Sequence, residues 1–344
     1  MIVSIILLVL LGISALINFK QILMTSNFAG KVTAPGRGYG PRLSEVTVRD
    51  NKSANKIAVI SVEGVISGGT SAQSRYSMLQ MIQQQLSMAK DDADVKAVVL
   101  HVDSPGGEVL AADDINHAIK EFQRLSRKPV VVSMGTLAAS GGYYISAPCD
   151  WIVANELTIT GSIGVIMEGY NFRGLLDKIG VSPVVFKSGK FKDMLNPAKE
   201  PEEVTPEEKK LVQDLIDETF QKFKSIVSDG RSAAYAKRGN GDRGARLSAD
   251  WEQYADGRIL SGKEALKLGL VDELGDFDAA IERAVKLSGA GDADVIEYQS
   301  VFEFADVFRM FGKSDARAIK VDLGIDVPKL RTGCMYFLPS SYVP

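Results

Sequence analysis

The 344-residue chain has very few of the residues that most often carry metal or histidine-based chemistry. It contains two cysteines and two histidines. Cys149 and Cys334 form no metal-binding motif, and a single pair of cysteines gives no disulfide framework. We therefore predict two unrelated thiols and no metal site.

A strong excess of charge is also lacking. The 40 basic and 43 acidic residues leave a net charge of −3, and the two signs are mixed along the chain. Proteins that bind nucleic acid usually carry a basic excess, so the composition predicts no nucleic-acid partner. The hydrophobic content of 45% is ordinary for a globular protein.

Only one long uncharged run stands out, at residues 2–19. As a helix it spans roughly 27 Å at 1.5 Å per residue, enough to cross a bilayer core. The basic n-region of a signal peptide is missing, so we predict a retained transmembrane anchor over residues 1–19. The first basic residues follow the run, and the positive-inside rule taken alone favours a cytoplasmic body.

Residues 20–54 are rich in glycine, proline and polar side chains, which is typical of a linker. Beyond them, apolar β-branched runs alternate with helical periodicity. Continuous apolar strands separated by helices predict an α/β fold with a largely parallel sheet covered on both faces. Strands are expected at 56–62, 96–102, 129–134, 150–155 and 183–187, and helices at 74–89, 108–126, 277–288 and from Thr205 to about Asp229.

Two glycine-rich junctions each end a strand and open a helix, "HVDSPGGEV" (101–109) and "MGTLAASGGYY" (134–144). Backbone amides at such junctions can bind an anion. Ser140 in the second junction could use them as oxyanion donors, and losing one such donor typically costs about 3–4 kcal/mol. Either junction alone is equally consistent with a tight turn. Together, on consecutive strand-helix units, they favour a site with Ser140 as nucleophile.

A nucleophilic serine needs a base, and the sequence offers several. His101 lies on a predicted strand and His117 on the polar side of a helix, so a Ser-His-Asp triad is poorly supported. A lysine base needs its pKa lowered from about 10.4 towards 7–8, which requires burial. Lys187, Lys190 and Lys192 follow the last predicted strand, and position alone does not choose between them.

Five motifs occur in a characteristic order: "DSPGG", "AASGGYYIS", "TGSIGV", "KSGKFKD" and "DGRILSGKEALKLGLVDELG". With them the chain resembles the bacterial signal peptide peptidase A family, which are membrane-bound Ser–Lys proteases, in its short single-domain form. The resemblance covers about residues 55–288 and implies a Clp-protease/crotonase-like fold. It leaves residues 289–344 as a C-terminal extension of unknown role.

The resemblance also implies roles for individual residues. Ser140 matches the nucleophile and Lys192, in "KFKD", matches the general base. The backbone amides of Gly107 and Ser140 match the oxyanion hole, and Ser162 in "TGSIGV" matches a serine that orients the lysine. Neither a metal nor an organic cofactor is implied.

Family members form homo-oligomeric rings in which the nucleophile and the lysine come from neighbouring subunits. By resemblance we expect a single-pass protein of the bacterial cytoplasmic membrane, with its body outside the cytoplasm. The implied substrates are remnant signal peptides or other unfolded apolar peptides, with Ala, Leu or Met beside the cleaved bond. The apolar tail suggests a further hypothesis, that residues 337–342 lie in a neighbour's substrate groove.

Two other classes of function remain open at this point. A crotonase-type acyl-CoA enzyme would use the same paired amides with a carboxylate base, and would not need Ser140 or Lys192. A non-catalytic membrane scaffold could retain the fold of a decayed protease.

Overall fold

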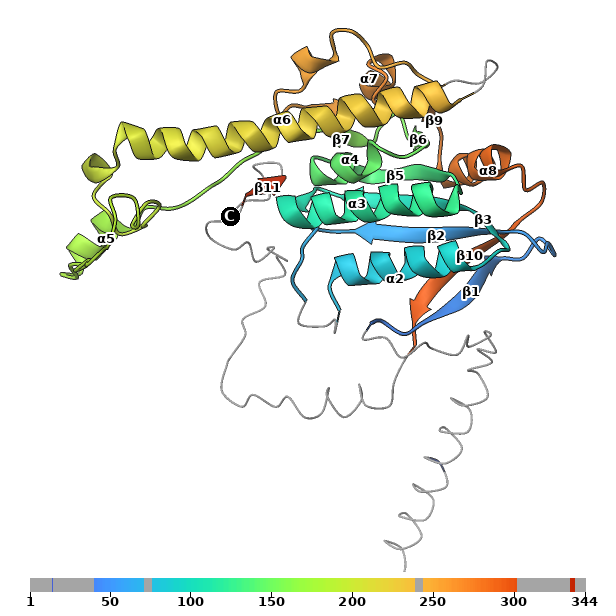
Figure 1. The fold of residues 1–344 in the computed structure, drawn as a ribbon, viewed down its shortest axis with the longest axis horizontal. Coiled ribbons are helices and arrows are strands. Elements are labelled where there is room, and N and C mark those ends of the chain that lie inside the picture. The colour runs from blue at the N-terminus through green and yellow to red at the C-terminus, as the bar shows by residue number, and fades with distance from the viewer. Residues whose placement is uncertain (1–13, 15–39, 71–75, 239–243, 302–334, 338–344) are drawn as a thin grey trace, which may run out of the picture.

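The computed structural model describes residues 14, 40–70, 76–238, 244–301 and 335–337. A mixed sheet in the order β1-β10-β2-β3-β5-β6-β9 forms its centre, with β7 and β8 attached beside β5 (Figure 1). A separate antiparallel pair joins β4 to β11. The strands are β1 (Leu43–Arg49), β2 (Lys56–Glu63), β3 (Val95–Ser104), β4 (Gly107–Glu108), β5 (Val130–Ala139), β6 (Trp151–Ala154), β7 (Ile159–Gly161), β8 (Ile259–Ser261), β9 (Glu273–Leu274), β10 (Asp294–Ser300) and β11 (Tyr336–Phe337).

The central strands run parallel and are buried on both faces, as their continuous apolar sequences predict. On β3, Val98 belongs to one hydrophobic core and Val99 to the other, because successive side chains point to opposite faces. α2 (Met78–Asp91) and α3 (Val109–Ser126) cover the first face, and α8 (Phe277–Ser288) covers the second. This arrangement confirms the predicted α/β class.

The long helix α6 (Pro206–Lys237) crosses above α4 (Gly141–Ser146) in Figure 1. It begins at Pro206, where Thr205 and Glu208 form a capping box. The helix continues past the predicted end near Asp229. At Gly230 an added Cβ would lie 2.6 Å from the Ala147 carbonyl oxygen, so glycine allows the helix to pack tightly on the turn after α4. The other short helices are α5 (Arg173–Lys178) and α7 (Gly262–Lys267).

The four predicted strands from 56–62 to 150–155 correspond to β2, β3, β5 and β6. The strand predicted at 183–187 is wrong, because no strand forms there. Val184 and Phe186 are 77% and 94% exposed. These residues have strand propensity but no sheet neighbour within the described chain.

The sheet extends beyond the predicted domain at both ends. β1 lies within the predicted linker and pairs antiparallel with β10, which lies within the predicted C-terminal extension. β10 in turn pairs parallel with β2. The boundaries predicted at residues 55 and 288 are therefore too narrow, since the sheet includes residues 43–49 and 294–300.

Within the described residues, no helix has the length and apolar character needed to span a bilayer. The anchor predicted over residues 1–19 lies outside them, apart from Ser14, which is helical. Cys149 is a buried free thiol whose pKa is raised by its burial, and Cys334 lies outside the described residues.

Candidate active site

Ser140 occupies a sharp turn between β5 and α4. Its φ of 53° and ψ of −115° are unusual for a residue with a side chain, and such strain costs on the order of 1–3 kcal/mol. The residue is 1% exposed. Its hydroxyl oxygen is buried and has no hydrogen-bond partner among the described residues. A strained turn that holds an unsatisfied hydroxyl is typical of a functional site.

The two glycine-rich junctions of the sequence meet at this turn. A Cβ on Gly141 would lie 3.0 Å from the Cα of Gly106, and one on Gly142 would lie 2.8 Å from the carbonyl oxygen of Ser104. Gly141 and Gly106 can approach this closely because neither carries a side chain, and Gly142 leaves room for the Ser104 carbonyl. Gly107 therefore lies beside the Ser140 turn.

The amide of Ser140 is already engaged. It donates a hydrogen bond to the carbonyl oxygen of Gly161, at 2.8 Å. This corrects the prediction that the Ser140 amide is an oxyanion donor, because a single N–H bonded to Gly161 is not free for an oxyanion. The next amide along the chain, that of Gly141, lies close to the Gly106–Gly107 turn.

Ser162 also lies at this turn. β7 pairs parallel with β5 so that Gly161 is opposite Ala139, and Ser162 follows directly. Ser162 is buried, has a φ of 49°, and donates its amide to the carbonyl of Arg258 at 2.7 Å. The structure thus brings Ser140 and Ser162 to the ends of adjacent parallel strands.

Lys192 does not join them within one chain. It lies on residues 170–204, a segment that we call the arm and that projects from the sheet together with the start of α6 (Figure 1). Lys192 is exposed, whereas Ser140 is buried and its hydroxyl forms no hydrogen bond within the described chain.

The surroundings of the three candidate lysines differ. The ammonium of Lys187 donates to both carboxylate oxygens of Asp193, at 2.8 Å each, and Lys190 pairs with Glu207. Over the described part of the chain, the side chain of Lys192 forms no ion pair or hydrogen bond. Of these three lysines, Lys192 is therefore the one whose side chain has no such partner.

The two histidines lie away from the serine. His101 is on β3 and packs edge-to-face with Phe277 of α8, 5.7 Å between ring centroids. It therefore faces the side of the sheet that α8 covers, opposite the side of α4. His117 pairs with Asp113 on the surface of α3. Neither histidine supplies a base to Ser140 within the chain.

A short extended segment lies between β4 and Ile166, beside the glycine turns. We call the space between β4 and Ile166 the groove. Tyr336 and Phe337 form β11, which pairs antiparallel with β4. On its other side, Tyr336 exchanges two backbone hydrogen bonds with Ile166, at 3.1 and 3.2 Å. The carbonyl of Met335 accepts from the amide of Val109, at 3.2 Å. The groove therefore holds an extended peptide backbone from both sides.

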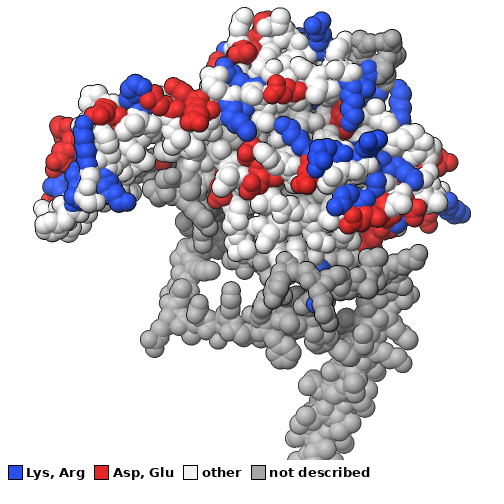
Figure 2. Space-filling view, viewed as in Figure 1, with Lys and Arg blue, Asp and Glu red and all other residues white. Residues whose placement is uncertain are grey.

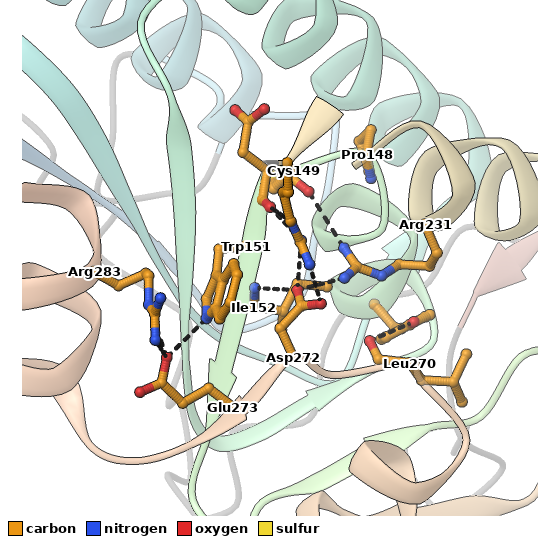
Figure 3. Close-up of polar contacts among 12 residues, drawn as sticks. Pro148, Cys149, Trp151, Ile152, Arg231, Leu270, Asp272, Glu273 and Arg283 are labelled. Carbon is orange, nitrogen blue, oxygen red and sulfur yellow. Dashed lines mark hydrogen bonds and ion pairs between the residues drawn. The ribbon is translucent and has the colours of Figure 1, made fainter. Parts of the chain in front are cut away.

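A buried ionic cluster attaches α6 to the sheet (Figure 3). Asp272 pairs with Arg231 and also with Arg238, whose closest bond is 2.6 Å, and accepts the Ile152 amide at 2.9 Å. The side chains of Asp272 and Arg231 are almost fully buried. The cluster fixes α6, the helix whose Phe223 lies beside the groove.

Trp151 completes this cluster. Its ring lies between the guanidinium groups of Arg238 and Arg283, at 4.4 and 3.8 Å from the ring centroid. Its indole N–H donates to Glu273 at 2.9 Å. Sequence analysis did not identify this cluster. Arg231 lies in α6, Arg238 follows the last residue of that helix, and Asp272 lies 41 residues beyond Arg231.

Acidic and basic side chains are interleaved over the face in Figure 2, on the arm as well as on the body. This agrees with the mixed signs along the sequence. The view shows no extended field of one sign that would attract a strongly charged polymer.

Comparison with known proteins identifies the family. The model for peptidase family S49 matches residues 123–291, and the model for Clp protease matches residues 49–150. An Enterococcus faecium protein, named as signal peptide peptidase SppA, is 38% identical over 262 residues, or 75% of this chain and 71% of that protein. A Synechocystis protein, named as a protease, is 38% identical over 272 residues, or 78% of this chain and 88% of that protein.

The chloroplastic serine protease SPPA of Arabidopsis thaliana is 32% identical over 230 residues, which cover 66% of this chain and 32% of that protein. These relatives displace the acyl-CoA and scaffold alternatives. The chain belongs to peptidase family S49 and is a serine peptidase with a Clp-protease-like α/β fold.

Proposed function

We propose that the protein is a Ser–Lys endopeptidase that degrades remnant signal peptides or other unfolded apolar peptides at the bacterial cytoplasmic membrane. The name of the Enterococcus relative supports the substrate class. The uncharged run at residues 2–19 supports a single-pass anchor. We place the catalytic body outside the cytoplasm, following the family resemblance.

One observation carries the proposal. The buried and partnerless hydroxyl of Ser140 lies at a turn beside a groove that holds an extended peptide backbone. A nucleophile and a binding site for peptide backbone are the two parts that peptide-bond cleavage requires.

In the proposed mechanism, neutral Lys192 takes the proton of Ser140 as the serine oxygen attacks the substrate carbonyl carbon. The amides of Gly107 and Gly141 hold the oxyanion, with Gly141 replacing the Ser140 amide that Gly161 occupies. The protonated lysine then gives its proton to the leaving amine. Water activated by the same lysine hydrolyses the acyl-enzyme.

Ser162 orients the lysine in this proposal. It lies next to the residue that accepts the Ser140 amide, so a lysine that reaches Ser140 also approaches Ser162. Because the reaction needs a neutral lysine, activity should rise between pH 6 and pH 9.

We propose that Lys192 reaches Ser140 of a neighbouring copy in a homo-oligomeric ring. The arm supports this, since it exposes large apolar side chains that a second copy would cover. These are Tyr170, Phe172, Leu175, Ile179, Val181, Val184, Val185, Phe186 and Leu195.

Complementation tests the shared site. The full-length protein is purified in detergent as wild type, Ser140→Ala and Lys192→Ala, and cleavage of an unfolded protein is measured. Each variant alone should lose about a thousandfold or more in activity. Co-expressing the two variants in one oligomer should restore roughly a quarter of wild-type activity, because random pairing joins an intact serine to an intact lysine in that fraction of sites.

Lys190→Ala is the matched control, because it removes a neighbouring lysine that is paired with Glu207. It should keep most of the activity. Retained activity in Lys192→Ala would show that the base lies elsewhere, and a mixed oligomer as inactive as its parents would contradict a site shared between copies.

A further inference from the structure

The proposed oxyanion donor, the amide of Gly107, belongs to a peptide unit that rotates easily. It joins Gly107 to Gly106, whose φ is 102°, and neither residue has a side chain that restricts its backbone. A donor that stabilises an oxyanion must already point at the site when the charge develops. Contacts from outside the Gly106–Gly107 peptide must therefore hold its orientation.

Ile66 holds this peptide from the edge of β4 that faces away from the groove. It forms a parallel bridge with Gly107, in which the Ile66 amide donates to the Gly106 carbonyl and the Ile66 carbonyl accepts from the Glu108 amide, both at 2.8 Å. Along a strand, the N–H and C=O groups of successive residues point to opposite edges. Because Ile66 engages the residues on either side of Gly107, the amide of Gly107 points towards the groove.

The glycines make this contact close. A Cβ at Gly107 would lie 1.9 Å from the carbonyl oxygen of Ile66, so a side chain there would displace Ile66. The amide of Gly106 donates to the hydroxyl of Ser104 at 3.1 Å, which fixes the start of the turn. The orientation of the Gly107 amide thus depends on Ile66 staying in place.

The loop that carries Ile66, residues 64–69, is attached to the sheet on both sides of that residue. On one side, the amide of Gly64 donates to the carbonyl of Asp103 at 2.9 Å. The side chain of Ile66 itself is fully buried. The attachment on the other side comes from a side chain of β4.

That side chain is Glu108, the residue directly after the proposed donor. Its carboxylate accepts hydrogen bonds from the amide of Gly68 at 2.9 Å and from the hydroxyl of Ser67 at 3.3 Å. Hydrogen bonds to a carboxylate are stronger than those between neutral groups. Glu108 therefore ties the loop to the same strand whose backbone Ile66 orients.

We propose that Glu108 is a positioning residue for the oxyanion hole: its carboxylate keeps Ile66 on β4 and so keeps the Gly107 amide directed at the site. The inference rests on the proposed function, in which this amide holds the oxyanion. Without the carboxylate, the glycine-glycine peptide gains rotational freedom. The loss should fall on the chemical step rather than on substrate binding, because the oxyanion forms only in the transition state.

Variants of the full-length protein in detergent test the role, with an internally quenched peptide as substrate. Glu108→Ala should lower kcat at least about tenfold and change KM by less than about twofold. Glu108→Gln keeps an acceptor for the Gly68 amide and should recover most of the loss. Glu121→Ala removes the same side chain from an exposed position of α3 and is the control. A wild-type kcat in Glu108→Ala, or an equal loss in Glu108→Gln, overturns the proposal.

Two inhibitors distinguish a displaced donor from a change in the shape of the groove. A peptide aldehyde forms a tetrahedral adduct with Ser140, whose oxygen uses the oxyanion donors, whereas the matching peptide alcohol binds without this bond. Glu108→Ala should weaken the aldehyde about tenfold and leave the alcohol unchanged. Equal weakening of the two inhibitors would show that Glu108 shapes the groove, and would overturn the proposal.

A fluorophosphonate probe separates this inference from the function on which it rests. If wild type neither reacts at Ser140 nor cleaves any peptide, the proposed function fails and this inference fails with it. If wild type reacts and cleaves, and Glu108→Ala matches it in kcat, the inference alone fails.

Discussion

The Ser140 amide and the Gly161 carbonyl are joined by a hydrogen bond of 2.8 Å, which ties the turn that contains Ser140 to the end of β7. The amide nitrogen of Gly141 lies close to Gly106–Gly107. In the proposed mechanism, where this amide holds the oxyanion in place of the Ser140 amide, the position of Gly141 is critical for catalysis.

Gly141→Ala keeps the backbone N–H but should displace it from the oxyanion, and kcat should fall by about a hundredfold, the order of effect of losing one donor. The added methyl would lie 3.0 Å from the Cα of Gly106 and would push the two turns apart. Steady-state kinetics on full-length protein measure the effect. Gly169→Ala is the control, since nothing lies within 4 Å of a Cβ there. Equal kcat values for the two variants would contradict the assignment.

Most of the sheet and the glycine-rich turn at Ser140 could be predicted from local sequence. The continuous apolar runs of β2, β3 and β5 indicate strands buried on both faces, and the Thr205–Glu208 capping box marks the start of α6. The two glycine-rich junctions follow adjacent strands, so parallel pairing brings them together.

Other features depend on contacts that no local pattern contains. β1 is a partly exposed edge strand, and β10 is only partly buried, so neither has the continuous apolar run that identifies a central strand. The strands that β10 pairs with lie some 240 residues away in sequence. The run at 183–187 is apolar and β-branched, but it has no partner strand among the residues that the structure describes. The Ser140 amide was assigned by resemblance, and only the register of β5 and β7 reveals its bond to Gly161.

Asp272→Ala should destabilise the protein by about 3–5 kcal/mol, because it leaves the buried guanidinium of Arg231 and that of Arg238 without their carboxylate. Urea denaturation followed by circular dichroism measures the free energy of unfolding. Asp256→Ala breaks an exposed pair with Arg258 and should leave the free energy of unfolding nearly unchanged. Similar losses in the two variants would show that the buried cluster is not a main attachment of α6.

The fold of the arm should depend on pH. Hydrogen bonding to Lys187 lowers the pKa of Asp193, and hydrogen bonding to Lys199 lowers that of Glu208. Groups with a lowered pKa stabilise the fold above their unfolded pKa, at about pH 4, and lose this contribution as the pH falls through the lowered value. The arm should therefore open in acid before the sheet unfolds.

The Lys199–Glu208 pair also sets an alkaline limit. Hydrogen bonding to Glu208 raises the pKa of Lys199, so its contribution to the stability of the arm persists through neutral pH and is lost as the pH rises through the raised value.

Hydrogen exchange tests the opening of the arm in acid. Read by mass spectrometry from pH 3 to pH 7 and corrected for the intrinsic rate, it follows the opening of residues 187–208. Protection of the arm that falls together with that of β3 would contradict separate opening.

Phe186→Asp should weaken assembly without unfolding the chain. Phe186 is 94% exposed, so its replacement removes no contact within the described chain. If the arm docks on a neighbouring copy, the new carboxylate would be buried at that interface without a partner, which is costly. Sedimentation of the full-length protein in detergent should show a smaller assembly, and peptidase activity should fall with it. Gln253→Asp makes the same change of charge at an exposed position outside the arm and serves as the control. An unchanged assembly in Phe186→Asp, with full activity, would show that the apolar arm contacts something other than a second copy.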